Sequence, residues 1–149
     1  MTKVIGDLTI WHRIEYSIRS PRWSINMAYT VLVVDDNDMN LALIAKILEL
    51  EGYRVIVAHN GLEAIQAVVA CMPDLAILDV MMPDMDGYEL CKKLRRPPLN
   101  ALVPIVLLTA MSSEMERHLA LQAGANDIWS KPFDMDLFRH RVGELLNPA

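Results

Sequence analysis

Five side chains suited to phosphate chemistry stand at or just after the ends of short apolar runs: Asp35, Asp36, Asp79, Thr109 and Lys131. Runs that are apolar throughout indicate strands buried on both faces, as in a parallel sheet covered by helices. Ligands of open parallel sheets bind outside the carboxyl ends of the strands. We therefore expect these side chains to converge on one edge of a sheet.

The chemistry of this set is that of phosphoryl transfer. Three neighbouring carboxylates repel one another unless a cation joins them, and hard oxygen ligands favour Mg²⁺. The Lys131 ammonium suits a phosphoryl oxygen, and the Thr109 hydroxyl can donate to another. Each residue alone would be an ordinary cap, strand end or solvated charge. The prediction of phosphoryl transfer onto an acid therefore depends on all five occurring together.

The elements that must position these side chains alternate regularly from Thr30 onward. Strands are predicted at residues 31–34, 53–58, 75–78, 104–108 and 127–129. Helices are predicted at residues 38–51, 62–71, 88–95, 113–124 and 134–145. The predicted fold class is α/β, with a flavodoxin-like doubly wound parallel sheet of five strands and five helices.

Short polar residues mark the expected helix starts. Asp38, Asn60 and Asp134 are predicted to cap three of the helices. Ser113 and Glu116 have the spacing of a capping box, in which each side chain accepts from the other residue's backbone N–H.

Composition limits the classes of function. A chain of 149 residues suffices for one domain with a core and hardly for two. A net charge of −5 argues against direct binding of nucleic acid. Cys71 and Cys91 are isolated, which predicts a reduced, cytoplasmic chain with core cysteines. No apolar stretch approaches the roughly 18 residues of a membrane span, and the ten methionines are expected to be mostly core filler.

Residues 1–28 do not follow the alternation. Their apolar residues fit both a strand period and a helical stripe, so periodicity does not decide between the two. We expect an N-terminal extension of uncertain structure, mobile or loosely docked, with Met27 as an alternative natural start. Two tryptophans in this segment leave a packing or partner role open. The predicted domain covers residues 29–149.

Four motifs carry a resemblance to a known family. They are VLVVDDN at residues 31–37, LDVMMPDMDG at 78–87, LLTA at 107–110 and KPF at 131–133. In this order they resemble the receiver domain of bacterial response regulators, the phosphoaccepting module of two-component signal transduction. The resemblance covers about residues 29–147. It implies a signalling domain that can dephosphorylate itself and is not a turnover enzyme.

The resemblance assigns a role to each acidic site residue. Asp79 resembles the phosphoacceptor that takes a phosphoryl group from the phosphohistidine of a sensor histidine kinase or phosphotransfer protein. Asp35 and Asp36 resemble the acidic pair that holds Mg²⁺, together with Asp79 and the backbone carbonyl of Met81. With Mg²⁺ nearby, we expect Asp79 to be ionised at neutral pH.

The remaining motifs carry the switch of the family. Thr109 resembles the hydroxyl that moves towards the phosphoryl group, and Lys131 resembles the phosphoryl-binding lysine. Pro132 resembles the family's cis proline, since X-Pro bonds lose most of the trans preference. Ile128 departs from the pattern, because the family usually has Tyr or Phe there. Its neighbour Trp129 is predicted to point to the opposite face of the strand, so the usual coupling of the hydroxyl to an aromatic rotamer is not expected in its ordinary form.

A second departure concerns Met81 and Met111, each two residues after a site residue. The family varies at these positions, and they tune the lifetime of the phosphoryl group. Both side chains are apolar here, so neither can position an attacking water. We expect a long-lived phosphorylated form.

Partners and rival functions follow from the same residues. The chain ends just after its last predicted helix, so output through contact with a downstream protein or an output domain is expected. A second copy of the chain is a further candidate partner. A Mg²⁺-dependent phosphohydrolase of the haloacid-dehalogenase type would need an Asp-x-Asp-x-Thr pattern that the chain lacks. A flavodoxin would need a phosphate loop where Asp35 and Asp36 stand, and a non-phosphorylated interaction module stays open.

Overall fold

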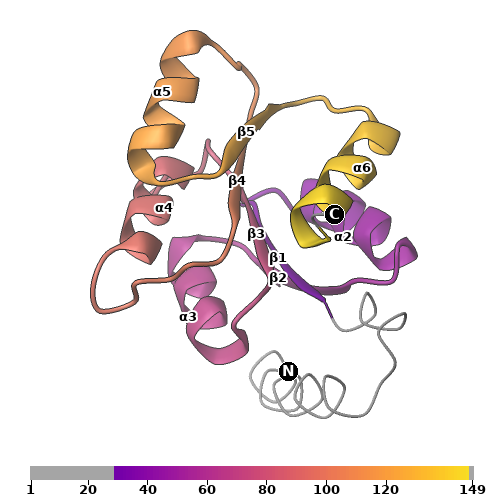
Figure 1. Cartoon of the computed structure of the whole chain (residues 1–149), viewed down its shortest axis with the longest axis horizontal. Coiled ribbons are helices and arrows are strands. Elements are labelled where there is room, and N and C mark those ends of the chain that lie inside the picture. Colours follow the sequence, from indigo (N-terminus) through magenta and orange to yellow (C-terminus); the bar gives the residue numbers. More distant parts are fainter. Residues whose placement is uncertain (1–28, 148–149) are drawn as a thin grey trace.

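A single parallel sheet forms the centre of the molecule (Figure 1). The computed structural model describes residues 29–147, and the predictions for residues 1–28 lie outside this range. The strands are β1 (Thr30–Val34), β2 (Arg54–Ala58), β3 (Leu75–Asp79), β4 (Ile105–Thr109) and β5 (Asp127–Ser130). Their order in the sheet is β2-β1-β3-β4-β5, and every neighbouring pair is parallel.

Helices cover both faces of this sheet, because each parallel connection must cross over it. The helices of the described residues are α2 (Asp38–Leu50), α3 (Gly61–Cys71), α4 (Gly87–Arg95), α5 (Glu114–Ala123) and α6 (Met135–Leu146). In Figure 1, α3, α4 and α5 lie on one side of the strands, and α2 and α6 lie on the other. The predicted doubly wound α/β fold is confirmed.

Alternation along the strands divides the core into two clusters. Leu78 and Ile128 belong to the cluster under α3, α4 and α5. Ile77 and Trp129 belong to the cluster under α2 and α6. All five residues of β3 are buried, and burying one large aliphatic side chain stabilises the fold by about 1.5–3 kcal/mol. Asp79 is therefore fixed in place by the strand that it ends.

Three of the predicted caps are confirmed and one is wrong. Asn60, Ser113 and Asp134 are N-caps whose side chains accept from backbone N–H groups. For α2 the N-cap is Asn37 rather than Asp38, because Asn37 has the extended backbone (φ −96°, ψ 115°) and accepts from the N–H three residues later. Asp38 is the first helical residue, where its charge still complements the helix dipole.

Two composition-based predictions have different outcomes. Cys71 and Cys91 are buried and form no disulfide, as predicted for core cysteines. The prediction that methionines mostly fill the core is wrong among residues 29–147, where the exposed ones are Met39, Met72, Met81, Met111, Met115 and Met135. Among the same residues, no helix is both long and apolar enough to cross a membrane.

Candidate functional site

The predicted site residues lie at the carboxyl edge of the sheet, where β1 and β3 diverge into connections on opposite faces. Asp35 directly follows β1, and Asp79 is the last residue of β3. One carboxylate oxygen from each of Asp35, Asp36 and Asp79 lies within 4.8 Å of the others. Asp35 and Asp79 are buried, at 1% and 3% exposed, whereas Asp36 is exposed. The structure therefore brings the three acids together with one open side.

Lys131 is the cation that faces this acidic cluster. Its Nζ donates to Asp79 Oδ1 at 2.6 Å and lies 3.9 Å from Asp35 Oδ2. The Lys131 backbone N–H donates to the Thr109 carbonyl at 2.7 Å, which anchors the loop after β5 to the end of β4. The Lys131–Pro132 bond is cis, as predicted. The loop that follows β5 thus holds the Lys131 ammonium against the Asp79 carboxylate at the end of β3.

The Asp79 carboxyl has a pKa above its ordinary value. Burial is the largest cause, and the neighbouring charge of Asp35 adds to it, with a smaller contribution from Asp36. The hydrogen bond from Lys131 lowers the pKa and offsets part of the shift. The site therefore disfavours its own ionised form, and an additional cation would relieve this penalty.

Asp35 is oriented by neighbours in the turn before α2. Its Oδ1 accepts from the Asn37 backbone N–H at 2.9 Å, and its Oδ2 accepts from Asn40 Nδ2 at 3.3 Å. Asn40 was not predicted from the sequence, although it stands one turn into the helix that follows the acidic pair. These bonds fix which lone pairs of Asp35 face the cluster.

The segment after Asp79 returns closely against it. A Cβ on Gly87 would lie 2.6 Å from the Asp79 carbonyl oxygen and 2.9 Å from the Val80 Cα, so only glycine fits there. Asp86 is the N-cap of α4, and Asp84 has a left-handed backbone (φ 68°), so these two acids belong to the turn that leads into α4. Met81 lies 74% exposed at the start of this segment, and the role of its carbonyl as a Mg²⁺ ligand stays a prediction.

Thr109 is buried at the end of β4, and its hydroxyl bonds to a partner that was not predicted from the sequence. Oγ1 has two acceptors in reach, Glu116 Oε1 at 2.6 Å and the Met111 carbonyl at 3.1 Å, and it accepts from the Met111 backbone N–H at 3.2 Å. The predicted capping box is therefore half formed. The Ser113 hydroxyl accepts from the Glu116 N–H at 3.3 Å, while the Glu116 carboxylate bonds to Thr109.

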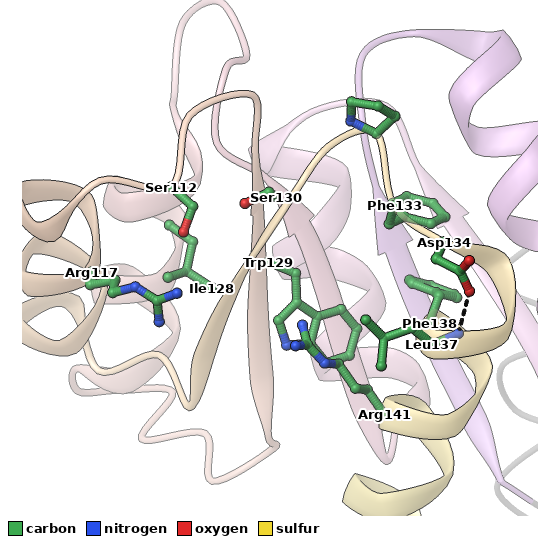
Figure 2. A pocket seen from close by; sticks show the side chains of 11 residues that line it. Ser112, Arg117, Ile128, Trp129, Ser130, Phe133, Asp134, Leu137, Phe138 and Arg141 are labelled. Carbon is green, nitrogen blue, oxygen red and sulfur yellow. Dashed lines mark hydrogen bonds between the residues drawn. The ribbon is translucent and has the colours of Figure 1, made fainter.

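Ile128 and Trp129 point to opposite faces of β5, as predicted (Figure 2). Figure 2 shows Ile128 directed towards Ser112 on the α5 side, and Trp129 directed towards α6. The Trp129 indole lies edge-on to the Phe138 ring, with the Arg141 guanidinium 5.6 Å from its centroid. A cavity of about 260 Å³ opens beside these groups. The position usually aromatic in the family is thus a buried aliphatic.

Comparison with known proteins identifies the family. Residues 31–143 match the response regulator receiver domain. The alkaline phosphatase synthesis transcriptional regulatory protein PhoP of Bacillus subtilis is 42% identical over 116 residues, which cover 78% of this chain and 48% of PhoP. The chain thus spans about half the length of that relative.

Two solved structures extend the comparison. A putative response regulator from Chloroflexus aurantiacus is 39% identical, with a TM-score of 0.74 over 79% of this chain and 97% of that one. The receiver domain of sensor histidine kinase PA1611 from Pseudomonas aeruginosa is 30% identical, with a TM-score of 0.72 and the same coverage. The chain belongs to the response regulator receiver domain family. It is a receiver domain of two-component signalling, and the phosphohydrolase alternative is not favoured.

Proposed function

We propose that Asp79 is the phosphoacceptor and that it takes a phosphoryl group from the phosphohistidine of a sensor histidine kinase or phosphotransfer protein. The observation that supports this most directly is the Lys131 ammonium, 2.6 Å from Oδ1 of a buried carboxylate that has two further acids beside it. Such a group is both a nucleophile and the neighbour of a cation suited to phosphoryl oxygens.

Mg²⁺ fits this site by the chemistry of its donors. Asp35, Asp36 and Asp79 offer hard carboxylate oxygens, and two of the three acids are buried. Among residues 29–147, Lys131 is the one cation paired with them. The three acids, with the Met81 carbonyl, would hold Mg²⁺. When bound, the ion supplies charge neutralisation for the transferring phosphoryl oxygens. The structure of the PA1611 receiver domain has a magnesium ion coordinated in its active-site cleft.

The residues of the chain then carry the transfer. An Asp79 oxygen attacks phosphorus in line, the bond from phosphorus to the donor nitrogen breaks, and its electron pair returns to the donor imidazole. Lys131 binds an oxygen of the phosphoryl group as it moves onto Asp79. The Thr109 hydroxyl donates to another oxygen, which requires it to leave Glu116.

The output of this reaction is a change of surface that another protein recognises. We propose that the partner is a downstream protein, an output domain or a second copy of the chain, with no direct contact to nucleic acid or membrane. A cytoplasmic location and slow self-dephosphorylation belong to the same proposal. They are supported by the two buried cysteines, which form no disulfide, and by the two exposed methionines at the site.

Incubation with acetyl phosphate and Mg²⁺ tests the proposal. We expect one phosphoryl group per chain, stable to acid, labile to base and absent from Asp79→Asn. Steady release of phosphate without an adduct would support a hydrolase instead. No adduct at all, from this donor or from a phosphohistidine donor, would support a non-phosphorylated interaction module.

A further inference from the structure

The Thr109 hydroxyl is engaged on the side away from the acceptor. Its Oγ1 lies 2.6 Å from Glu116 Oε1 and 3.1 Å from the Met111 carbonyl oxygen, so Glu116 is the closer of its two acceptors. Thr109 is only 3% exposed, so water does not readily replace this partner. A threonine hydroxyl has a single hydrogen to donate. It therefore cannot serve Glu116 and a phosphoryl oxygen at the same time.

A second hydroxyl converges on the same carboxylate oxygen. Tyr88, on α4, donates to Glu116 Oε1 at 3.4 Å. The pKa of Tyr88 is raised to about 12, first by burial and then by the charge of Glu116. The Glu116 carboxylate thus lies between the Thr109 and Tyr88 hydroxyls.

We propose that Glu116 is a positioning residue that latches Thr109 in its unphosphorylated orientation, and that phosphorylation of Asp79 releases the latch. This inference rests on the proposed function, because the phosphoryl oxygen is the acceptor that competes with Glu116 for the Thr109 hydroxyl. Glu116 thereby sets how readily the site accepts a phosphoryl group and how strongly α5 responds.

Releasing Thr109 costs little free energy, because the Glu116 carboxylate can turn to a second donor, the backbone N–H of the Ser113 cap. Glu116 occupies the third helical position after the Ser113 cap, from which a glutamate can accept the Ser113 backbone N–H and complete a capping box. The other half of the box is already present, as Ser113 Oγ accepts from the Glu116 N–H at 3.3 Å. The carboxylate can thus exchange the Thr109 hydroxyl for the Ser113 backbone N–H as its hydrogen-bond donor. Two such arrangements make a two-state element.

The latch also accounts for the departure at Ile128. The aliphatic Ile128 side chain is 4% exposed and has no polar group with which to report the state of Thr109. In this chain the aromatic residue linked to the switch hydroxyl is instead Tyr88, through Glu116. The signal is therefore passed to the contact between α4 and α5.

The test compares Glu116→Ala, Glu116→Gln and Glu114→Ala with the unchanged full chain. Glu114 is an exposed acid in the first turn of the same helix, so its removal controls for charge. NMR couplings to the Thr109 methyl group report its χ1 rotamer without any phosphoryl donor. Titration with beryllofluoride and Mg²⁺, which mimic the phosphoryl group, reports the affinity of the site.

Glu116→Ala should change the Thr109 rotamer and tighten beryllofluoride binding about tenfold, because the competent orientation is then more populated. Glu116→Gln keeps an oxygen that accepts from Thr109, so its rotamer should stay as in the unchanged chain, and Glu114→Ala should alter neither readout. An unchanged rotamer in Glu116→Ala would overturn the latch. Equal tightening in all three variants would also overturn it, because charge alone would then explain the result.

Failure of the proposed function gives a different pattern. If Asp79 were not the acceptor, beryllofluoride would bind the unchanged chain no better than Asp79→Asn. The Thr109 rotamer would still report whether Glu116 holds the hydroxyl. Glu116→Gln also controls for misfolding, because it keeps a side chain of the same size and an oxygen that can accept from Thr109.

Discussion

The two halves of the site differ in whether their hydrogen-bond donor is directed towards Asp79 or away from it. The acceptor half consists of Asp35, Asp79 and Lys131, and the switch half consists of Thr109, Glu116 and Tyr88. In the acceptor half the ammonium already faces the carboxylate that we propose as the nucleophile. In the switch half the hydroxyl is bonded away from it.

This difference separates chemistry from signalling. The acceptor half needs little rearrangement, since charges already directed at the reacting atoms cost no reorganisation during the reaction. The switch half has to exchange one hydrogen-bond partner for another, and that exchange couples a local charge to a helix. Changes in the acceptor half should therefore affect whether Asp79 is modified, and changes in the switch half should affect what the modification does.

Removal of the metal should break the acceptor half most completely. With excess EDTA we expect the acetyl phosphate adduct to be lost, because Lys131 alone cannot neutralise three acids and an incoming phosphoryl group. Mass spectrometry of the intact protein measures the adduct, and restoring Mg²⁺ should restore it. Undiminished phosphorylation in EDTA would contradict the assignment of the acidic cluster as a metal site.

Lys131→Ala should slow formation of the adduct about 100-fold, the usual cost of removing one charge-stabilising donor from a reaction centre. Asp79 would keep its acidic neighbours and lose its 2.6 Å partner. Lys93→Ala, on the exposed face of α4, provides the matched control and should phosphorylate normally. Equal rates for the two variants would show that the acceptor half does not depend on its cation.

Asp79→Asn should stabilise the metal-free domain at pH 7 by about 1 kcal/mol. The folded-state pKa of Asp79 is raised, first by burial, so the folded chain binds a proton more tightly than the unfolded chain. Stability therefore falls as pH rises from the ordinary carboxyl pKa through the raised one. The extra free energy of unfolding of the variant, relative to the unchanged chain, should therefore decrease as pH is lowered through this window.

Urea unfolding at several pH values measures this gain. Mg²⁺ should stabilise the unchanged chain more than the variant, because it binds the folded state through Asp79. A variant that is less stable than the unchanged chain at pH 7 without metal would show that the Lys131 pair outweighs the burial penalty. The ionised Asp79 carboxylate would then make a net favourable contribution to the stability of the domain.

The sequence was sufficient to predict the fold and the acceptor half. Fully apolar runs that end in Asp35, Asp79 and Thr109 define parallel strands and the edge at which they meet. Alternation alone placed Ile128 and Trp129 on opposite faces. Each of these predictions depends on local pattern and on the topology that the pattern dictates.

The hydrogen bonds of the switch half could not be predicted from the sequence, because they depend on which of two nearby partners the Glu116 side chain contacts. The spacing of Ser113 and Glu116 predicted a mutual capping box, but the Thr109 hydroxyl takes the carboxylate in the structure. The preference of Asn37 over Asp38 as the cap of α2 is a similar choice between neighbours. The burial of the methionines was also predicted wrongly, since apolar character alone does not determine which face of a helix or loop a residue occupies.

The smallest effect that we expect concerns the open side between the two halves. Met81 and Met111 are 74% and 70% exposed there, one beside each half, and neither offers a hydrogen-bonding group strong enough to orient water. Met81→Asn supplies such a group and should shorten the lifetime of the phosphorylated form severalfold without changing how fast the form is made. Met135→Asn, at the exposed first position of α6, should leave the lifetime unaltered. Loss of the phosphoryl group from the unchanged chain within seconds, with no acceleration by Met81→Asn, would show that water reaches the acceptor half by another route.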